Sequence, residues 1–177
     1  MQLCWRLGLT WCLGAFSGAF FSMAQAAPVC FTEPSRVQTP MLVELEVVLD
    51  PSEPGLLTLP ELNASTEIYG SVCLTWSPDR RFVALTERIG SNLIETSVID
   101  TQHVVAGALV KEQGFVQAFP LDVQQHLANA DHTYSEVVAW QSSGLQLHLF
   151  GHSPAYDHQL RCQPSAGSWQ CQKVNTP

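Results

Sequence analysis

The chain has 177 residues and carries 16 acidic against 8 basic side chains, which gives a net charge of −8 at pH 7. An acidic chain lacks the basic surface that nucleic acids require, so this composition excludes the usual nucleic-acid-binding proteins. The length favours a single domain.

The first 26 residues have the organisation of a secretory signal peptide. Arg6 precedes an apolar run from Leu7 to Phe21, and Ala24-Gln25-Ala26 provides the small residues that signal peptidase reads. An uncleaved anchor is the alternative, because the run approaches the length that spans a bilayer. Cleavage would leave one β-rich domain, residues 27–177, with a net charge of −9. We therefore expect export, to the periplasm or beyond, and no stable membrane insertion after cleavage.

The remaining four cysteines predict two disulfides, as is typical of a small exported domain. Folding "RCQPSAGSWQCQ" at Ala166-Gly167 places Cys162 opposite Cys171, at a non-hydrogen-bonded site where two Cα atoms lie within disulfide range. We therefore predict Cys162–Cys171, which leaves Cys30–Cys73. The second bond would tie the mature N-terminus to a central strand.

Alternating and β-rich runs, separated by turn residues, predict strands along most of the mature chain. They are "MLVELEVVLD", "SVCLTW", "RFVALTER", "LIETSVID", "HVVAGALV", "SEVVAW", "LQLHLFGH", "HQLRCQ" and "SWQCQKV". Two segments differ. "DPSEPGLLTLPELNAST", residues 50–66, reads as a proline-rich loop or linker. The segment Leu121–Ala130 reads as a short helix, with Pro120 before its first turn and Asp122 near its positive end.

The strands fall into two units of four, Ser71–Lys111 and Tyr134–Val174, and each ends its first strand with tryptophan, at Trp76 and Trp140. "WSPDRRFVALTERIGSNLIETSVIDTQ" resembles the repeat of TolB-type and WD-type β-propellers, in which Trp-Ser-Pro-Asp-Gly leads into an apolar strand. The sequence departs from that repeat at Arg80, where the family has glycine in a left-handed conformation.

The resemblance implies an all-β fold, a partial β-propeller-like stack of antiparallel four-stranded sheets with one short helix. A third element would come from Met41–Leu62. About 151 mature residues are too few for a closed ring of four blades. The alternative is a β-sandwich.

No set of residues predicts catalysis, so we expect neither an enzyme nor a cofactor. Ser142-Ser143-Gly144 reads as a hairpin tip and not as a nucleophile elbow. The spacing of His148, His152 and His158 makes a metal-binding or hydrolytic enzyme conceivable. However, a strand and its following turn do not converge such ligands as a helix would, and we predict no metal site.

Loops at the ends of the strands are then the candidates for binding a protein partner. The candidate residues are Gly90, Ser91, Asn92, Ser142, Ser143, Gly144, His152 and Tyr156. Acidic residues between Glu33 and Glu67 suit a basic partner or form a solvated face.

In size, compartment and β-rich build the chain is similar to the periplasmic immunity proteins of type VI secretion amidase effectors. That likeness implies an inhibitor which blocks a secreted, cell-wall-degrading hydrolase by inserting a loop into its active site. An envelope scaffold or accessory protein is the alternative.

Overall fold

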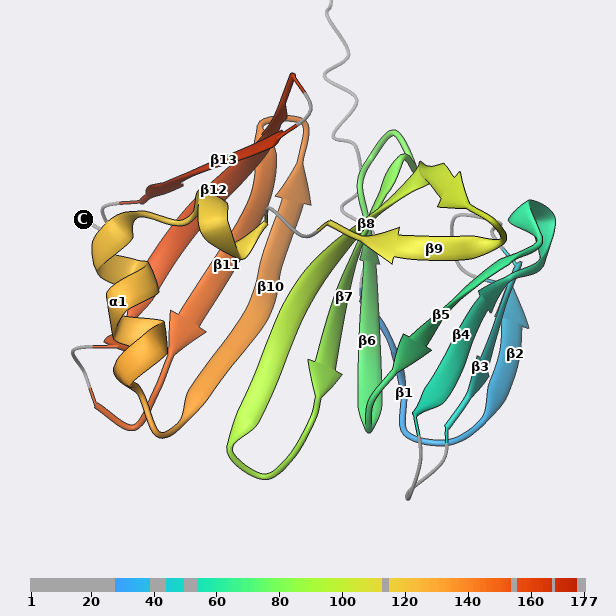
Figure 1. The fold of residues 1–177 in the computed structure, drawn as a ribbon, viewed down its shortest axis with the longest axis horizontal. Coiled ribbons are helices and arrows are strands. Elements are labelled where there is room, and N and C mark those ends of the chain that lie inside the picture. The colour runs from blue at the N-terminus through green and yellow to red at the C-terminus, as the bar shows by residue number, and fades with distance from the viewer. Residues whose placement is uncertain are drawn as a thin grey trace, which may run out of the picture.

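The computed structural model describes residues 28–38, 44–49, 54–112, 115–153, 156–166 and 168–174. The predicted leader and its cleavage site lie outside these ranges. Within them the protein is all-β, with one α-helix and two short 3-10 helices (Figure 1). The strands are β1 (Val29–Phe31), β2 (Ser35–Gln38), β3 (Glu44–Val48), β4 (Gly55–Leu59), β5 (Ala64–Ile68), β6 (Ser71–Trp76), β7 (Phe82–Arg88), β8 (Leu93–Val105), β9 (Ala108–Lys111), β10 (Thr133–Gln141), β11 (Gly144–Phe150), β12 (His158–Ser165) and β13 (Ser168–Lys173). The helical elements are η1 (Pro60–Leu62), η2 (Val116–Ala118) and α1 (Leu121–Asn129).

The strands form three neighbouring groups, which Figure 1 shows from right to left in blue-teal, green and orange. Strands β2 to β5 make one antiparallel meander, β1, β6, β7 and β8 make a central group, and β10 to β13 make a second meander. Short contacts join the groups. Strand β8 pairs in parallel with β10 at Ile94 and Tyr134. The remaining strand, β9, pairs antiparallel with β8 and in parallel with β5 at Ala108 and Ser65.

Strand β7 lies between two hydrophobic cores, because both of its faces are buried. Val83 and Leu85 face a core shared with β1, β3 to β6 and β9. Phe82 and Ala84 face a second core, formed with α1 and β10 to β13. The near-continuous apolar sequence of this strand is what burial on both faces requires.

Both predicted disulfides are present. Cys162 pairs directly with Cys171 across β12 and β13, with Cα atoms 4.1 Å apart, and Pro164 lies opposite Trp169 as the hairpin count predicts. Cys30 pairs with Cys73 across β1 and β6, with Cα atoms 4.0 Å apart. Strand β1 is therefore fastened to β6 by a covalent bond as well as by strand pairing.

The helix prediction is also confirmed, since α1 spans Leu121–Asn129 and buries Val123 fully against the second core. Trp76 is the last residue of β6 and Trp140 the penultimate residue of β10. Each is about 95% buried, one in each core.

Residues 50–66 were predicted as a loop or linker, which is wrong for the part that the structure describes. This part forms β4, η1 and the start of β5. Leu57 and Leu59 are buried while Leu56 is exposed, so the alternation of a half-buried strand overrides the proline content. Pro60 disrupts no strand, because it begins η1.

The predicted strand "HVVAGALV" is also wrong in its boundaries. Strand β8 continues from Leu93 to Val105, and Ala106 and Gly107 then turn the chain into β9 with positive φ angles of 50° and 80°. Positive φ at both central residues is typical of the two-residue turns that connect tight hairpins.

Strands β10 to β13 form a meander over the predicted unit Tyr134–Val174. The predicted unit Ser71–Lys111 differs, because β1 adds to it at β6 and its last strand, β9, also pairs with β5. The described strands leave β1, β2 and β13 at the ends of the hydrogen-bonded paths, so they form no closed ring. The propeller resemblance and the sandwich alternative both stay predictions.

Candidate functional site

The predicted partner-binding residues lie at opposite ends of the strands. Figure 1 shows the β10–β11 turn, with Ser142 and Ser143, at the top of the orange meander. The β7–β8 turn, with Gly90 to Asn92, and the β11–β12 connection, with His152 and Tyr156, lie at the bottom. The structure therefore divides the candidate residues between two sites.

A groove lies at the upper end, between the β6–β7 turn and the β10–β11 turn, and we call it the turn groove. Its volume is about 580 Å³. Its lining residues are Ser77, Pro78, Asp79, Phe82, Trp140, Gln141, Ser142, Gly144, Gln163 and Pro164. Phe82 and Trp140 stack with ring centroids 6.3 Å apart and are only 6% and 5% exposed, so they form a largely buried aromatic wall.

One side of the turn groove is the turn from Ser77 to Arg81, which its own hydrogen bonds hold in place. The Ser77 hydroxyl donates to the Asp79 carboxylate at 2.6 Å and accepts from the backbone N–H of Phe82 at 2.9 Å. The backbone N–H of Arg80 donates to the carbonyl of Ser77, which closes the turn. Serine at the first position and proline at the second are residues that a type I turn favours.

Arg80 adopts a left-handed conformation, with φ of 63°. The propeller repeats that the sequence resembles have glycine there. We expect Arg80→Gly to raise the free energy of unfolding by about 0.5 kcal/mol. Relief of about 1–2 kcal/mol of left-handed strain exceeds the entropic cost of glycine, about 0.5–1 kcal/mol. Urea unfolding of both proteins measures the difference.

The matched control is Arg81→Gly, which should destabilise because the neighbouring arginine has a partner. A decrease in stability for Arg80→Gly would show that its side chain makes a contact that outweighs the strain.

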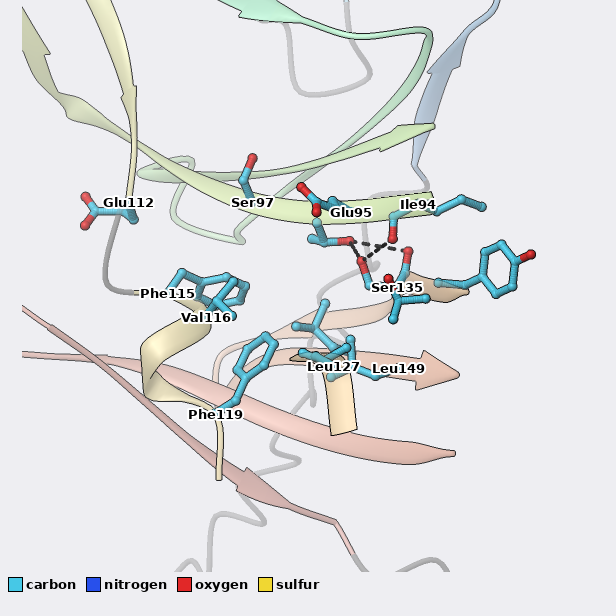
Figure 2. Close-up of a pocket in the computed structure, with 14 residues that line it drawn as sticks. Ile94, Glu95, Ser97, Glu112, Phe115, Val116, Phe119, Leu127, Ser135 and Leu149 are labelled. Atoms are coloured by element: carbon cyan, nitrogen blue, oxygen red, sulfur yellow. Dashed lines mark hydrogen bonds between the residues drawn. The ribbon is translucent and has the colours of Figure 1, made fainter. Parts of the chain in front are cut away.

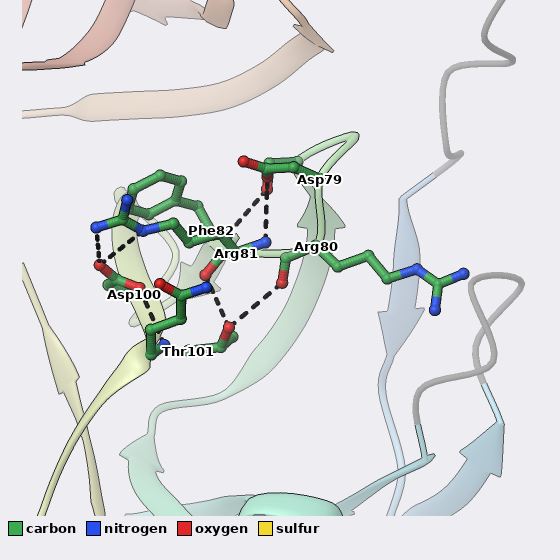
Figure 3. Close-up of polar contacts among 8 residues, drawn as sticks. Asp79, Arg80, Arg81, Phe82, Asp100 and Thr101 are labelled. Carbon is green, nitrogen blue, oxygen red and sulfur yellow. Dashed lines mark hydrogen bonds and ion pairs between the residues drawn. The ribbon is translucent and has the colours of Figure 1, made fainter.

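The partner of Arg81 is Asp100 on β8, as Figure 3 shows. Nε and Nη2 of Arg81 donate to the same carboxylate oxygen at 3.1 and 2.8 Å, whereas the Arg80 side chain points away. Burial alone would raise the pKa of Asp100, but the bonds from Arg81 and from the backbone N–H of Gln102 hold this pKa below its usual value. This stabilisation is present above the ordinary aspartate pKa and is lost as the pH falls through the lower native pKa.

The other side of the turn groove is the Ser142–Ser143 turn, which is braced at two points. Gly144 has φ of 123°, and a Cβ atom there would lie 2.5 Å from the carbonyl oxygen of Cys162. Only glycine fits such a position. The side-chain amide of Gln163 donates to the carbonyl oxygen of Ser143. The exposed Ser142 side chain therefore stands on a fixed backbone.

At the lower end, aromatic rings form separate pairs. His132 stacks on His152 with centroids 4.3 Å apart, and the Tyr134 hydroxyl lies 3.3 Å from Nε2 of His152. His126 on α1 stacks on His158, with Nδ1 and Nε2 2.9 Å apart, and also contacts Tyr156 edge-on.

His148 faces away from α1 and lies between two carboxylates, 3.1 Å from Glu136 and 2.9 Å from Asp157. His148, His152 and His158 therefore belong to three different contacts and do not converge. In the part of the chain that the structure describes, no three His, Cys, Asp or Glu side chains are grouped to hold a metal ion.

The pKa of His158 is lowered, first by burial and then by the charges of Lys173 and His126. The lowered pKa means that the native state disfavours the charged imidazole more than the unfolded chain does. Stability is therefore full above the ordinary pKa near 6.5 and is lost as the pH falls through the lower native pKa. We expect His158→Gln to lose less stability than the wild type between pH 7 and pH 5. Denaturant unfolding at the two pH values measures this.

His103→Gln serves as the control, because His103 lies exposed on β8, away from the contact of His158 with His126. An equal loss in the wild type and in His158→Gln would contradict the assignment.

The turn groove includes residues that the sequence did not suggest as a site. Ser77, Pro78 and Asp79 appear in the sequence only as a turn, and Gln163 and Pro164 only as a strand. Their contribution depends on the packing of β7 against β10, which no local pattern encodes. The predicted residues Asn92 and His152 do lie at the same end of the strands. The carbonyl of Asn92 accepts a hydrogen bond from the backbone N–H of Thr133, and the next residue, Tyr134, contacts His152.

Comparison with protein-family models, curated proteins and solved structures gives no significant match. No helix in the described ranges has the length and apolar character to cross a membrane. The two disulfides are typical of proteins that fold in an oxidising compartment.

Proposed function

We propose that this protein is an exported, non-enzymatic binding protein that recognises a protein partner through the turn groove. The braced Ser142–Ser143 turn carries the proposal. Binding surfaces that are rigid before association lose little conformational entropy when they dock. Gly144 and Gln163 provide that rigidity directly beneath the exposed side chain.

The partner that we propose is a secreted, cell-wall-degrading hydrolase, blocked in the periplasm. The turn carries only small side chains, so it fits a narrow catalytic cleft. The exposed Asp79 carboxylate across the groove suits a partner with cationic residues around its active site. The net negative charge favours fast association with such a partner.

The test measures binding of the mature protein to a panel of purified secreted peptidoglycan amidases, and inhibition of their release of peptides from peptidoglycan. We expect Ser142→Trp to weaken binding and inhibition of a bound amidase at least about tenfold, because a bulky side chain no longer enters the cleft. Ser91→Trp is the matched control, since Ser91 is an exposed serine in the turn at the opposite end.

Two results would contradict the proposal. One is that none of the amidases is bound or inhibited. The other is that Ser91→Trp abolishes binding while Ser142→Trp leaves it intact, which would move the interface to the lower end.

A further inference from the structure

A second cavity, separate from the turn groove, lies between the central group and the C-terminal meander. Strands β8 and β10 pair only at Leu93 with Thr133 and at Ile94 with Tyr134, and then diverge. The space that opens between them has a volume of about 250 Å³. The connection through η2 and α1 covers it (Figure 2).

Apolar side chains make up most of the walls. They are Ile94, Phe115, Val116, Phe119, Leu127, Leu147 and Leu149. Phe115, Leu147 and Leu149 are at least 97% buried, so their positions are fixed by the second core. Apolar cavities of about 150 Å³ are known to take up molecules such as benzene, and this one is larger.

The hydroxyl groups on one wall bond to each other. Ser135 Oγ donates to Thr96 Oγ1 at 2.9 Å, and Thr96 Oγ1 lies 3.0 Å from Thr86 Oγ1. The nearby acidic side chains point elsewhere. Figure 2 shows Glu112 directed away from the phenylalanines and Glu95 on the opposite side of β8 from Leu127. No charged group is therefore aimed into the cavity by the residues that line it.

The edge of β8 beside the cavity supplies backbone hydrogen-bonding groups. The pairing with β10 ends at Ile94, and on this edge the next bonds are those of Val98 with Glu112 and of Ile99 with β9. Between them, residues 95–97 have no strand partner on this edge within the described ranges. They line the cavity although their alternate side chains project from the other face. Of these residues, Thr96 directs its backbone N–H and C=O to this edge, as Val98 does, and these groups are available to a ligand. Glu95 and Ser97 direct theirs to Glu87 and Leu85 on β7.

We propose that this cavity is a binding site for a small, neutral, apolar molecule that carries one hydrogen-bonding group, such as an amide or a diarylamine. The apolar part lies among Phe119, Leu127 and Leu149, and the polar group bonds to the β8 edge. The absence of an inward-directed charge in the lining disfavours an ionic ligand, since a buried ion needs a partner. The site does not depend on the partner proposed for the turn groove.

The probe is N-phenyl-1-naphthylamine, which is neutral, aromatic and has one N–H donor. We expect saturable 1:1 binding, with rising probe fluorescence. Tryptophan emission should be quenched, because the ring centroids of Trp169 and the wall residue Phe115 are 5.2 Å apart. Leu127→Trp fills the cavity and should weaken binding about tenfold or more. Leu62→Trp is the control, because Leu62 is an exposed leucine on η1.

Circular dichroism establishes that each variant is folded. Should Leu127→Trp not fold, nuclear Overhauser effects between the probe and the wild-type protein decide, and we expect them at the methyl groups of Leu127 and Leu149. The proposal is overturned by the absence of saturable binding, by equal weakening in both variants, or by contacts to leucines outside the cavity.

Discussion

Replacing Cys30 and Cys73 together with serine is expected to lower the free energy of unfolding by about 4 kcal/mol. The bond joins residues separated by 43 positions, and in the chain-entropy model a longer closed loop restricts the unfolded chain more strongly. It also holds β1, a strand of only three residues, against β6. Urea unfolding monitored by tryptophan fluorescence measures the change.

The Cys162→Ser/Cys171→Ser double variant is the matched control. Its bond spans 9 positions, so the same model gives a smaller loss, about 3 kcal/mol. An equal or larger loss for this hairpin bond would show that native-state packing, and not loop closure, determines what each disulfide contributes.

Lys111→Met is expected to destabilise the protein by about 3 kcal/mol, because it removes the partner of a buried carboxylate. The side chain of Glu87 is only 4% exposed, and its two oxygens accept from Lys111 Nζ at 2.7 Å and from the backbone N–H of Tyr69 at 3.0 Å. The Lys111 side chain is 30% exposed, which places the expected loss at the lower end for a broken buried pair. Thermal and urea unfolding measure it.

The double variant Glu87→Gln/Lys111→Met tests the cause. A neutral amide still accepts the bond from Tyr69 and needs no cation, so most of the lost stability should return. If the double variant is as unstable as Lys111→Met alone, the loss comes from the packing of the lysine stem and not from an unpaired charge.

Local patterns predicted the parts of the fold that local chemistry determines. The hairpin count from Ala166-Gly167 predicted the pairing of Cys162 with Cys171. Pro120 before α1 and Asp122 in its first turn predicted the helix. Strand β4 was missed because three prolines surround a five-residue strand, whose burial depends on β3 and β5. Strands β1 and β2 are short, and β1 pairs with β6, which lies far along the chain.

The candidate site was predicted only in part. Ser142, Ser143 and Gly144 stand out as a turn, and the structure places this turn beside the turn groove. The facing wall comes from Ser77 to Asp79, more than 60 residues earlier in the chain. Such a meeting of two turns is set by the contact of Phe82 with Trp140, which no single stretch of sequence reveals.

Strand β7 contributes to both hydrophobic cores, and this has a consequence for how the molecule comes apart. Loss of this strand would expose Val83 and Leu85 on one side and Phe82 and Ala84 on the other. Neither half can then melt while the other persists, so the amide protons of β7 should exchange with solvent only through global opening. A protein built in this way resists partial unfolding, and therefore also the proteolysis that partial unfolding permits.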